Sequence, residues 1–234
     1  MTLISFGASV AGPGHLRDGL PNQDAWAHAA LGGGRVVVVA DGLGSKPNAA
    51  VGSAAACDAV AEAVRIWLRH QGASRDVLLG LIHLLWRARV EPLSPDSAAT
   101  TCLFAFMRAD GSGLLGQLGD GLVLVLCDGH VRPHQLRSDD DFTNRTRALG
   151  VTRQLAGWNV AVLEPGERTV ILCTDGVSDD LLESKHLEFA EWMNGEIASL
   201  PPGPRWRRLA HELRHWPTPH HIDDKTIALL RSQE

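Results

Sequence analysis

The chain has 234 residues, of which 44% are hydrophobic and 21% charged, so it has enough apolar side chains for a sizeable core and does not have the composition of a disordered chain. Its formal net charge of −5 argues against nucleic acid or an anionic membrane as the main partner. No stretch is long and apolar enough to span a bilayer, and the first residues do not have the pattern of a signal peptide.

Apolar patterning predicts a mixture of short strands and amphipathic helices. The expected elements, in chain order, are strands at 3–10, 25–31 and 35–40, helices at 49–70 and 75–90, strands at 100–107, 114–118, 122–127, 156–163 and 168–173, helices around 186–199 and 205–215, and a final strand at 226–230. The strands form clusters and the helices come in two separate pairs. This order favours two sheets covered by helices over a repeated βαβ unit.

The four cysteines are far apart in the sequence and form no Cys-x-x-Cys motif. Most lie inside apolar runs, as expected of buried free thiols in a reducing compartment. We therefore expect a cytoplasmic protein.

An Asp-Gly pair follows an apolar strand three times, at Asp41, Asp120 and Asp175, and an Asp223–Asp224 pair precedes the last strand. A single junction of this kind can be a β-turn in which the aspartate caps its own backbone. Four of them indicate a cluster at one sheet edge, where carboxylates repel unless a cation neutralises them. Mg²⁺ and Mn²⁺ prefer such oxygen ligands, and a neighbouring glycine leaves room for carbonyl and water oxygens. Asp41 can then bridge two metals, with the Gly42 carbonyl as a further ligand.

The chain resembles the metal-dependent Ser/Thr protein phosphatases of type 2C, in particular their compact bacterial branch. The resemblance is carried by seven segments in the family's order: "NQDAW", "VVADGLGS", "SAATTCLF", "GDG", "RALG", "LEPGERTVILCTDGVSD" and "DDKT". It covers nearly the whole chain and implies one phosphatase domain over residues 1–234. The implied fold is α+β, a four-layer α/β/β/α sandwich of two antiparallel sheets flanked by helix pairs.

The resemblance also implies roles for individual residues. The catalytic residues would be Asp41, Asp175, Asp223 and Asp24, the last of them holding metal-bound water. The metal ligands would be Asp41, Gly42, Asp175 and Asp223 for two catalytic ions, with Asp120 and Asp179 at a third, weaker site. Thr100, Thr101 and the 147–150 turn would be structural.

The implied reaction is hydrolysis of phosphoserine and phosphothreonine in proteins by a hydroxide that bridges two Mn²⁺ or Mg²⁺ ions. The expected partner is a phosphorylated protein, with a cognate Ser/Thr kinase. Two other readings stay open: a non-catalytic module that keeps the fold and binds a signalling partner, and a phosphatase dedicated to a single anti-sigma-type regulator.

Two positions depart from the best-known relatives. Gly19 stands where they carry a phosphate-gripping arginine, so His15 or Arg17 would have to bind the substrate phosphate. We favour His15, although either residue can equally be a solvated loop side chain. Leu43 replaces a histidine proposed as a general acid. The polar segment 137–146 is expected to be a substrate-selecting flap or an ordinary loop.

Overall fold

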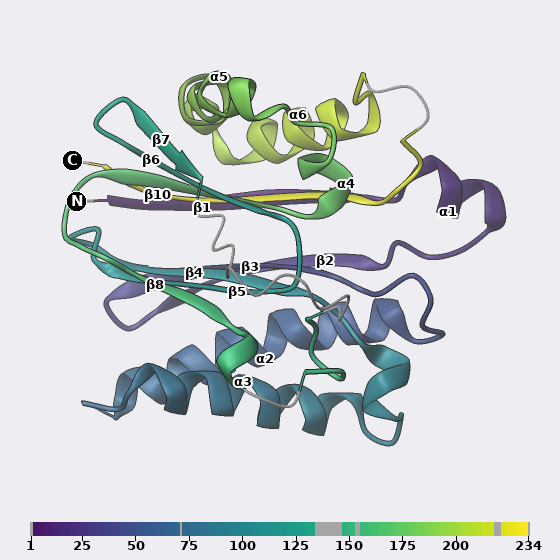
Figure 1. Cartoon of the computed structure of the whole chain (residues 1–234). Helices are drawn as coiled ribbons and strands as arrows, with labels where there is room; N and C mark the ends of the chain where they lie inside the picture. Colours follow the sequence, from purple (N-terminus) through teal and green to yellow (C-terminus); the bar gives the residue numbers. More distant parts are fainter. Residues whose placement is uncertain (1, 71, 134–146, 153–154, 218–220, 234) are drawn as a thin grey trace.

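The computed structural model describes residues 2–70, 72–133, 147–152, 155–217 and 221–233 (Figure 1). Its centre is a pair of five-stranded antiparallel sheets. In spatial order, sheet A contains β1 (Thr2–Val10), β10 (Lys225–Gln233), β9 (Arg168–Cys173), β6 (Leu122–Cys127) and β7 (His130–Pro133). Sheet B contains β2 (Asp24–Leu31), β3 (Gly34–Asp41), β4 (Cys102–Arg108), β5 (Gly113–Leu118) and β8 (Asn159–Leu163).

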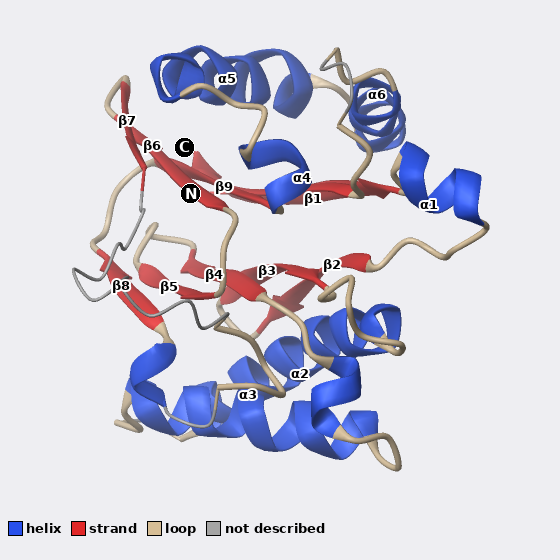
Figure 2. Cartoon of the chain, turned by 45° about the vertical axis from the view of Figure 1, so that its right-hand side comes forward, coloured by secondary structure: helices blue, strands red, loops and turns tan. Residues whose placement is uncertain are grey.

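Helices cover the outer face of each sheet (Figure 2). Sheet B is covered by α2 (Ala49–Arg69) and α3 (Arg75–Val90). Sheet A is covered by α5 (His186–Trp192), which continues into a π-helical turn at Met193–Ile197, and by α6 (Pro202–Arg214). The short elements are the α-helices α1 (Pro13–Asp18) and α4 (Asp175–Ser178) and the 3₁₀ turns at Pro95–Ala98, Leu155–Gly157 and Glu183–Lys185.

The valine run of β3 explains how the layers are held together. Val36 and Val38 belong to the core between sheet B and its helices, whereas Val37 and Val39 belong to the core between the two sheets. All four are fully buried. A strand with apolar neighbours on both faces needs no polar alternation, which is why the sequence reads as an unbroken apolar run. The expected four-layer α+β sandwich is confirmed.

Several element boundaries differ from the expectation. The strand expected at 100–107 begins at Cys102, and Thr100 before it forms isolated bridges to Gly42 and Leu149. The strand expected at 156–163 begins at Asn159, after the 3₁₀ turn. Periodicity also missed α1, α4 and β7, which are too short to show it. The expected flap at 137–146 lies outside the described residues. No helix in the described part of the chain is both long and apolar enough to cross a membrane.

Glycine at position 52 lets α2 touch the 3₁₀ turn before β4. A Cβ at Gly52 would collide with the carbonyl oxygen of Ala98, and the Gly52 carbonyl accepts a 3.0 Å hydrogen bond from Trp86 Nε1. We predict that Gly52→Ala lowers the free energy of unfolding by about 1–3 kcal/mol, measured by urea denaturation. Gly80→Ala in α3 is the control, because a Cβ there meets no atom within 4 Å. Gly80→Ala should raise the free energy of unfolding by about 0.5–1 kcal/mol. Equal changes in the two variants would contradict the packing argument.

Candidate active site

Asp41 is the last residue of β3, and hydrogen bonds from the segment just before β4 hold its backbone in place. Its amide donates to Thr101 Oγ1 at 2.9 Å, and its carbonyl accepts from Thr101 N at 2.8 Å and Thr100 Oγ1 at 2.9 Å. A Cβ at Gly42 would lie 2.5 Å from the Ala49 carbonyl oxygen. Only glycine therefore fits after Asp41, and the two threonines have the structural role expected of them.

Asp24 lies directly opposite Asp41 in the β2–β3 register. Facing residues of an antiparallel pair have Cβ atoms about 4.5–5.5 Å apart, so the two carboxyl groups are forced together. Asp24 is only 8% exposed, and its Oδ2 accepts a 2.8 Å hydrogen bond from Thr174 Oγ1 of sheet A. This bond connects the two sheets at the site.

Asp175 begins α4, directly after Thr174 at the end of β9. The amide of Thr174 donates to the Thr226 carbonyl at 3.1 Å, which fixes this junction against the start of β10. A Cβ at Gly176 would collide with the Asp224 carbonyl oxygen, so this Asp-Gly pair also packs tightly against backbone. Sheet A thus brings Asp175 to the same end of the sandwich as Asp41.

The two adjacent aspartates before β10 differ in their surroundings. Asp223 is exposed, while Asp224 is 2% exposed. Asp224 Oδ1 accepts from Gly12 N at 2.7 Å, and its Oδ2 accepts from Gln23 N at 2.6 Å. Asp224 is therefore committed to bonds within the protein, which leaves Asp223 as the ligand candidate of the pair. No local pattern in the sequence indicates that Asp224 is the residue that anchors this loop.

The two candidate ligands for a third metal, Asp120 and Asp179, are more exposed than Asp175. Asp120 lies in the β5–β6 turn between Gly119 and Gly121, whose φ values of 97° and 102° favour glycine. Asp179 donates its amide to the Asp175 carbonyl at 2.9 Å, so the two residues are one helical turn apart. Both carboxylates are exposed.

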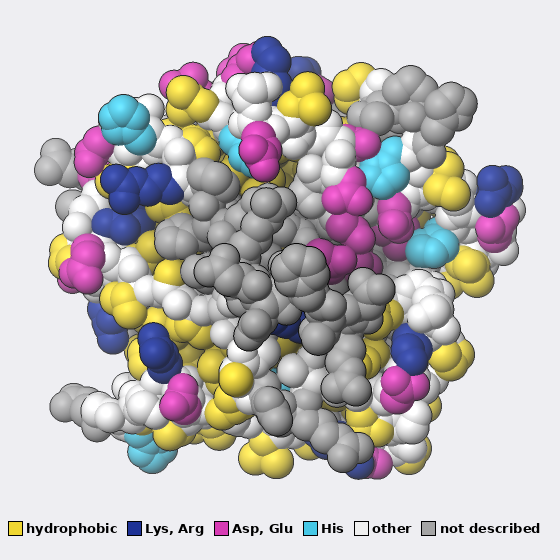
Figure 3. Space-filling model, viewed as in Figure 1, with side chains coloured by type: hydrophobic (Ala, Val, Ile, Leu, Met, Phe, Trp, Pro, Cys, Tyr) yellow, Lys and Arg dark blue, Asp and Glu magenta, His cyan; other side chains and the backbone are white. Residues whose placement is uncertain are grey.

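Burial and mutual repulsion raise the pKa values of several acids in this cluster. Burial, together with Asp24 and Asp175, raises the pKa of Asp41 far above its usual value. Burial also raises the pKa of Asp24, against hydrogen bonds from Thr226 and Thr174 that lower it. The pKa of Asp175 rises to about 6 through burial, Asp120 and Asp223. Figure 3 shows acidic side chains gathered on this face, with histidines beside them.

The donor set fits divalent cations in its chemistry. Among the described residues, no three His, Cys, Asp or Glu side chains are close enough to form a ready-made ligand shell. However, burial and other aspartates are the largest influences that raise the pKa values of Asp41 and Asp175. Carboxylates that are buried together need either protons or cations, and hard divalent ions prefer such oxygen donors.

The two candidates for phosphate binding have different environments. His15 Nδ1 lies 2.8 Å from Asp224 Oδ2, and its side chain is 19% exposed. Arg17 is 67% exposed and bonds its neighbour Asp18 through Nε at 2.8 Å and Nη2 at 3.1 Å. Only His15 is thus joined to the acid cluster by a bond in the described structure.

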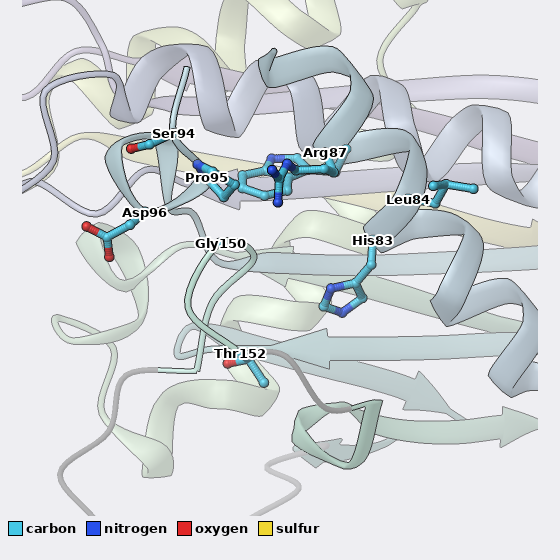
Figure 4. Close-up of a pocket in the computed structure, with 9 residues that line it drawn as sticks. His83, Leu84, Arg87, Ser94, Pro95, Asp96, Gly150 and Thr152 are labelled. Carbon is cyan, nitrogen blue, oxygen red and sulfur yellow. The ribbon is translucent and has the colours of Figure 1, made fainter. Parts of the chain in front are cut away.

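A separate cavity of about 540 Å³ lies between α3 and the 150–152 turn (Figure 4). Its polar side chains have structural partners. Trp158 Nε1 donates to His83 Nε2 at 2.9 Å, and burial lowers the pKa of His83, so this imidazole is neutral. Arg87 pairs with Glu91 at 3.2 Å. The cavity therefore offers no second catalytic centre.

Comparison with known proteins identifies the family. The family model for protein phosphatase 2C matches residues 11–214, and the chain belongs to this family of protein serine/threonine phosphatases. No curated protein matches the sequence. PppA, a regulatory component of the T6SS in Pseudomonas aeruginosa, is 19% identical with a TM-score of 0.69, over 100% of this chain and 99% of that one.

Two further solved structures show the same fold. The photosystem II phosphatase PBCP is 15% identical, with a TM-score of 0.67 over 99% of both chains. The SpoIIE fragment from Bacillus subtilis, which comprises its phosphatase domain and part of its regulatory domain, is 14% identical with a TM-score of 0.64. That alignment covers 98% of this chain and 61% of the SpoIIE fragment.

The raised carboxyl pKa values predict how the stability of metal-free protein depends on pH. A folded-state pKa above the usual 3.8 means that the folded chain keeps a proton that the unfolded chain has released. For Asp175, stability is therefore lost as pH rises from about 3.8 through about 6, and Asp41 extends this loss to higher pH. One such group changes the free energy of unfolding by at most about 1.4 kcal/mol per pH unit.

We predict that Asp41→Asn is stabilised relative to wild type, and increasingly so between pH 5 and pH 8, in urea denaturation with a chelator present. The exposed Asp58→Asn serves as control and should track wild type at both pH values. Adding Mn²⁺ should reverse the order of wild type and Asp41→Asn at pH 8. A constant difference across the pH range would contradict the proposed repulsion.

Proposed function

We propose that this phosphatase hydrolyses phosphoserine and phosphothreonine in a protein substrate and depends on two Mn²⁺ or Mg²⁺ ions. The observation that carries the proposal is the convergence of the buried Asp24 with the partly buried Asp41 and Asp175 at one end of the sandwich. The structure of RsbX in complex with magnesium, from a protein of similar fold, supports a divalent cation. The proposed ligands are Asp41, the Gly42 carbonyl, Asp175 and Asp223, with Asp120 and Asp179 at a weaker third site.

Bound divalent cations would supply a water of lowered pKa and neutralise charge on the phosphoryl oxygens. The chain's own contribution is positioning. The bonds from Thr100 and Thr101 hold the Asp41 backbone, and the hydrogen bond from Thr174 orients Asp24. Asp24 would accept a proton or a hydrogen bond from the attacking water, since its Oδ2 is already fixed by Thr174.

His15 is the proposed group for holding the substrate phosphate. Its Nδ1 is engaged by Asp224, which fixes the plane of the ring. With Nδ1 engaged by Asp224, Nε2 would be the atom that bonds a phosphoryl oxygen. Asp224 would also connect the 12–15 loop to the segment that carries the proposed ligand Asp223.

The proposed partners are phosphorylated proteins, together with a Ser/Thr kinase that supplies the substrate. The relatives named above include regulatory proteins, which supports a role in signalling. We propose no role for nucleic acid, because the chain carries a net charge of −5.

A graded mutant series tests the metal assignments. We predict that Asp41→Asn and Asp175→Asn each lower Mn²⁺-dependent turnover of a phosphothreonine peptide by about 10³-fold or more, because metal stabilisation of charge is worth several kcal/mol. Asp120→Asn and Asp179→Asn should lower turnover about 10-fold and raise the Mn²⁺ concentration needed for half-maximal rate. Calorimetric Mn²⁺ titration should show that these last two variants keep the tight sites.

Chelation is the control for the series and should abolish wild-type activity. Full turnover by chelated wild type would contradict metal dependence. Wild-type behaviour of Asp120→Asn and Asp179→Asn would instead make both residues simple turn formers. Absence of turnover by metal-loaded wild type on phosphoserine and phosphothreonine peptides would favour a non-catalytic signalling module.

The two phosphate candidates can be separated by kinetics. We predict that His15→Ala raises KM for p-nitrophenyl phosphate about 10–150-fold, which corresponds to the roughly 1.5–3 kcal/mol of a hydrogen bond to a charged group. Arg17→Ala should change KM less than about twofold, because that side chain is solvated and paired with Asp18. Mn²⁺ affinity should be unchanged in both. The opposite ranking would assign the phosphate to Arg17.

A further inference from the structure

A groove of about 730 Å³ lies on the outer side of sheet A, between α5 and α6, which Figure 2 shows side by side. Its walls are aromatic. Phe189 and Trp192 have ring centroids 5.9 Å apart, and Trp216 meets Phe189 edge-on at 6.4 Å. Phe189 is buried, whereas both tryptophans are partly exposed towards the groove. A pocket of this size with aromatic walls can enclose several side chains of a ligand.

The rim of the groove is strongly acidic. Four glutamates line it against one lysine, Lys185. Glu188 is paired with Lys185 at 2.6 Å, and Glu212 with Arg208 at 2.8 Å. Glu191 and Glu196 have no ion pair among the described residues. Aromatic rings that line the same groove as unpaired carboxylates are complementary to a cation with apolar neighbours, because the faces of indole rings attract guanidinium and ammonium groups.

The shape of the groove is set by the π-helical turn at Met193–Ile197. Such turns are rare and occur often at functional sites. This one is held to sheet A through its backbone, since Arg231 Nη1 donates to the Asn194 carbonyl at 3.1 Å. Gly195 faces the groove, and a Cβ there would meet no atom within 4 Å. The turn therefore leaves an open, preformed space instead of closing the wall.

We propose that this groove binds a short basic segment of a partner protein, with arginine or lysine side chains alternating with apolar ones. Lys185 and Glu196 both line the groove and are eleven residues apart, which corresponds to about 16 Å along a helix. This length matches roughly five residues of extended peptide and exceeds a single small cation. Leu181, two residues after Asp179, also lines the groove.

The test uses fluorescence anisotropy with the labelled peptide Arg-Leu-Arg-Leu-Arg, and the full chain. Wild type should bind it, and Gly195→Arg should weaken binding at least tenfold by placing a cation in the groove. Gly80→Arg in α3 is the matched control, because it makes the same substitution at an equally open helical glycine on the other side of the sandwich. Glu191→Lys with Glu196→Lys should weaken binding similarly. Turnover of p-nitrophenyl phosphate should be unchanged in all variants.

Further arms identify the chemistry of the occupant. Glu-Leu-Glu-Leu-Glu should not bind. Raising the salt concentration from 50 to 500 mM should weaken binding of the basic peptide, because salt partly screens the charges. Equal binding to Gly195→Arg and Gly80→Arg would overturn the proposal, since the peptide would then be held elsewhere, for example by the active-site acids. No binding by wild type at 1 mM peptide would also overturn it. If arginine amide competes as well as the unlabelled peptide, the occupant is a single cation and not a peptide segment, and the proposal is wrong.

Discussion

Repulsion between Asp24 and Asp41 is the constraint on which the active-site end of the sandwich depends. The β2–β3 register places these carboxyl groups opposite one another, and burial prevents water from screening them. Hydrogen bonds to neighbouring residues hold the two aspartates in this arrangement. Thr174 bonds the Asp24 carboxyl group, and Thr101 bonds the Asp41 backbone. Without these bonds, the side chains would relax towards solvent and the ligand geometry would be lost.

The protein also carries a second concentration of acid, and the two differ in their physical setting. At the end of the sheets, Asp24 is buried and Asp41 and Asp175 are partly buried, and burial raises the pKa values of all three. Those around the α5–α6 groove are largely exposed and line it together with aromatic rings. Buried carboxylates need a small ion of high charge, such as a divalent cation, to offset their repulsion. Solvated carboxylates can bind an extended, singly charged side chain with little loss of hydration. The difference in burial thus predicts two different kinds of ligand for one type of side chain.

The layers and most strands could be predicted from the sequence, because β3, β4, β6 and β9 are long apolar runs bounded by glycine or polar residues. The strand-end acids were predicted for the same reason: each carboxylate interrupts an apolar pattern at a definite point. The role of Asp224 could not be predicted, because its partners Gly12, His15 and Gln23 are about 200 residues away in the sequence. The Thr174 bond between sheets was missed for the same physical reason, since local pattern carries no information on long-range side-chain contacts.

The position of β10 has a consequence for biosynthesis. This strand, formed by residues 225–233, lies between β1 and β9 and pairs with both. Among the described strands of sheet A, β1 comes before the others in the sequence, whereas its neighbour β10 comes after them. A nascent chain interrupted before residue 225 therefore leaves β1 unpaired and separates Asp223 from the backbone that orders it. Because domains generally fold as units during synthesis, we expect the acid cluster to assemble after β10 has been translated.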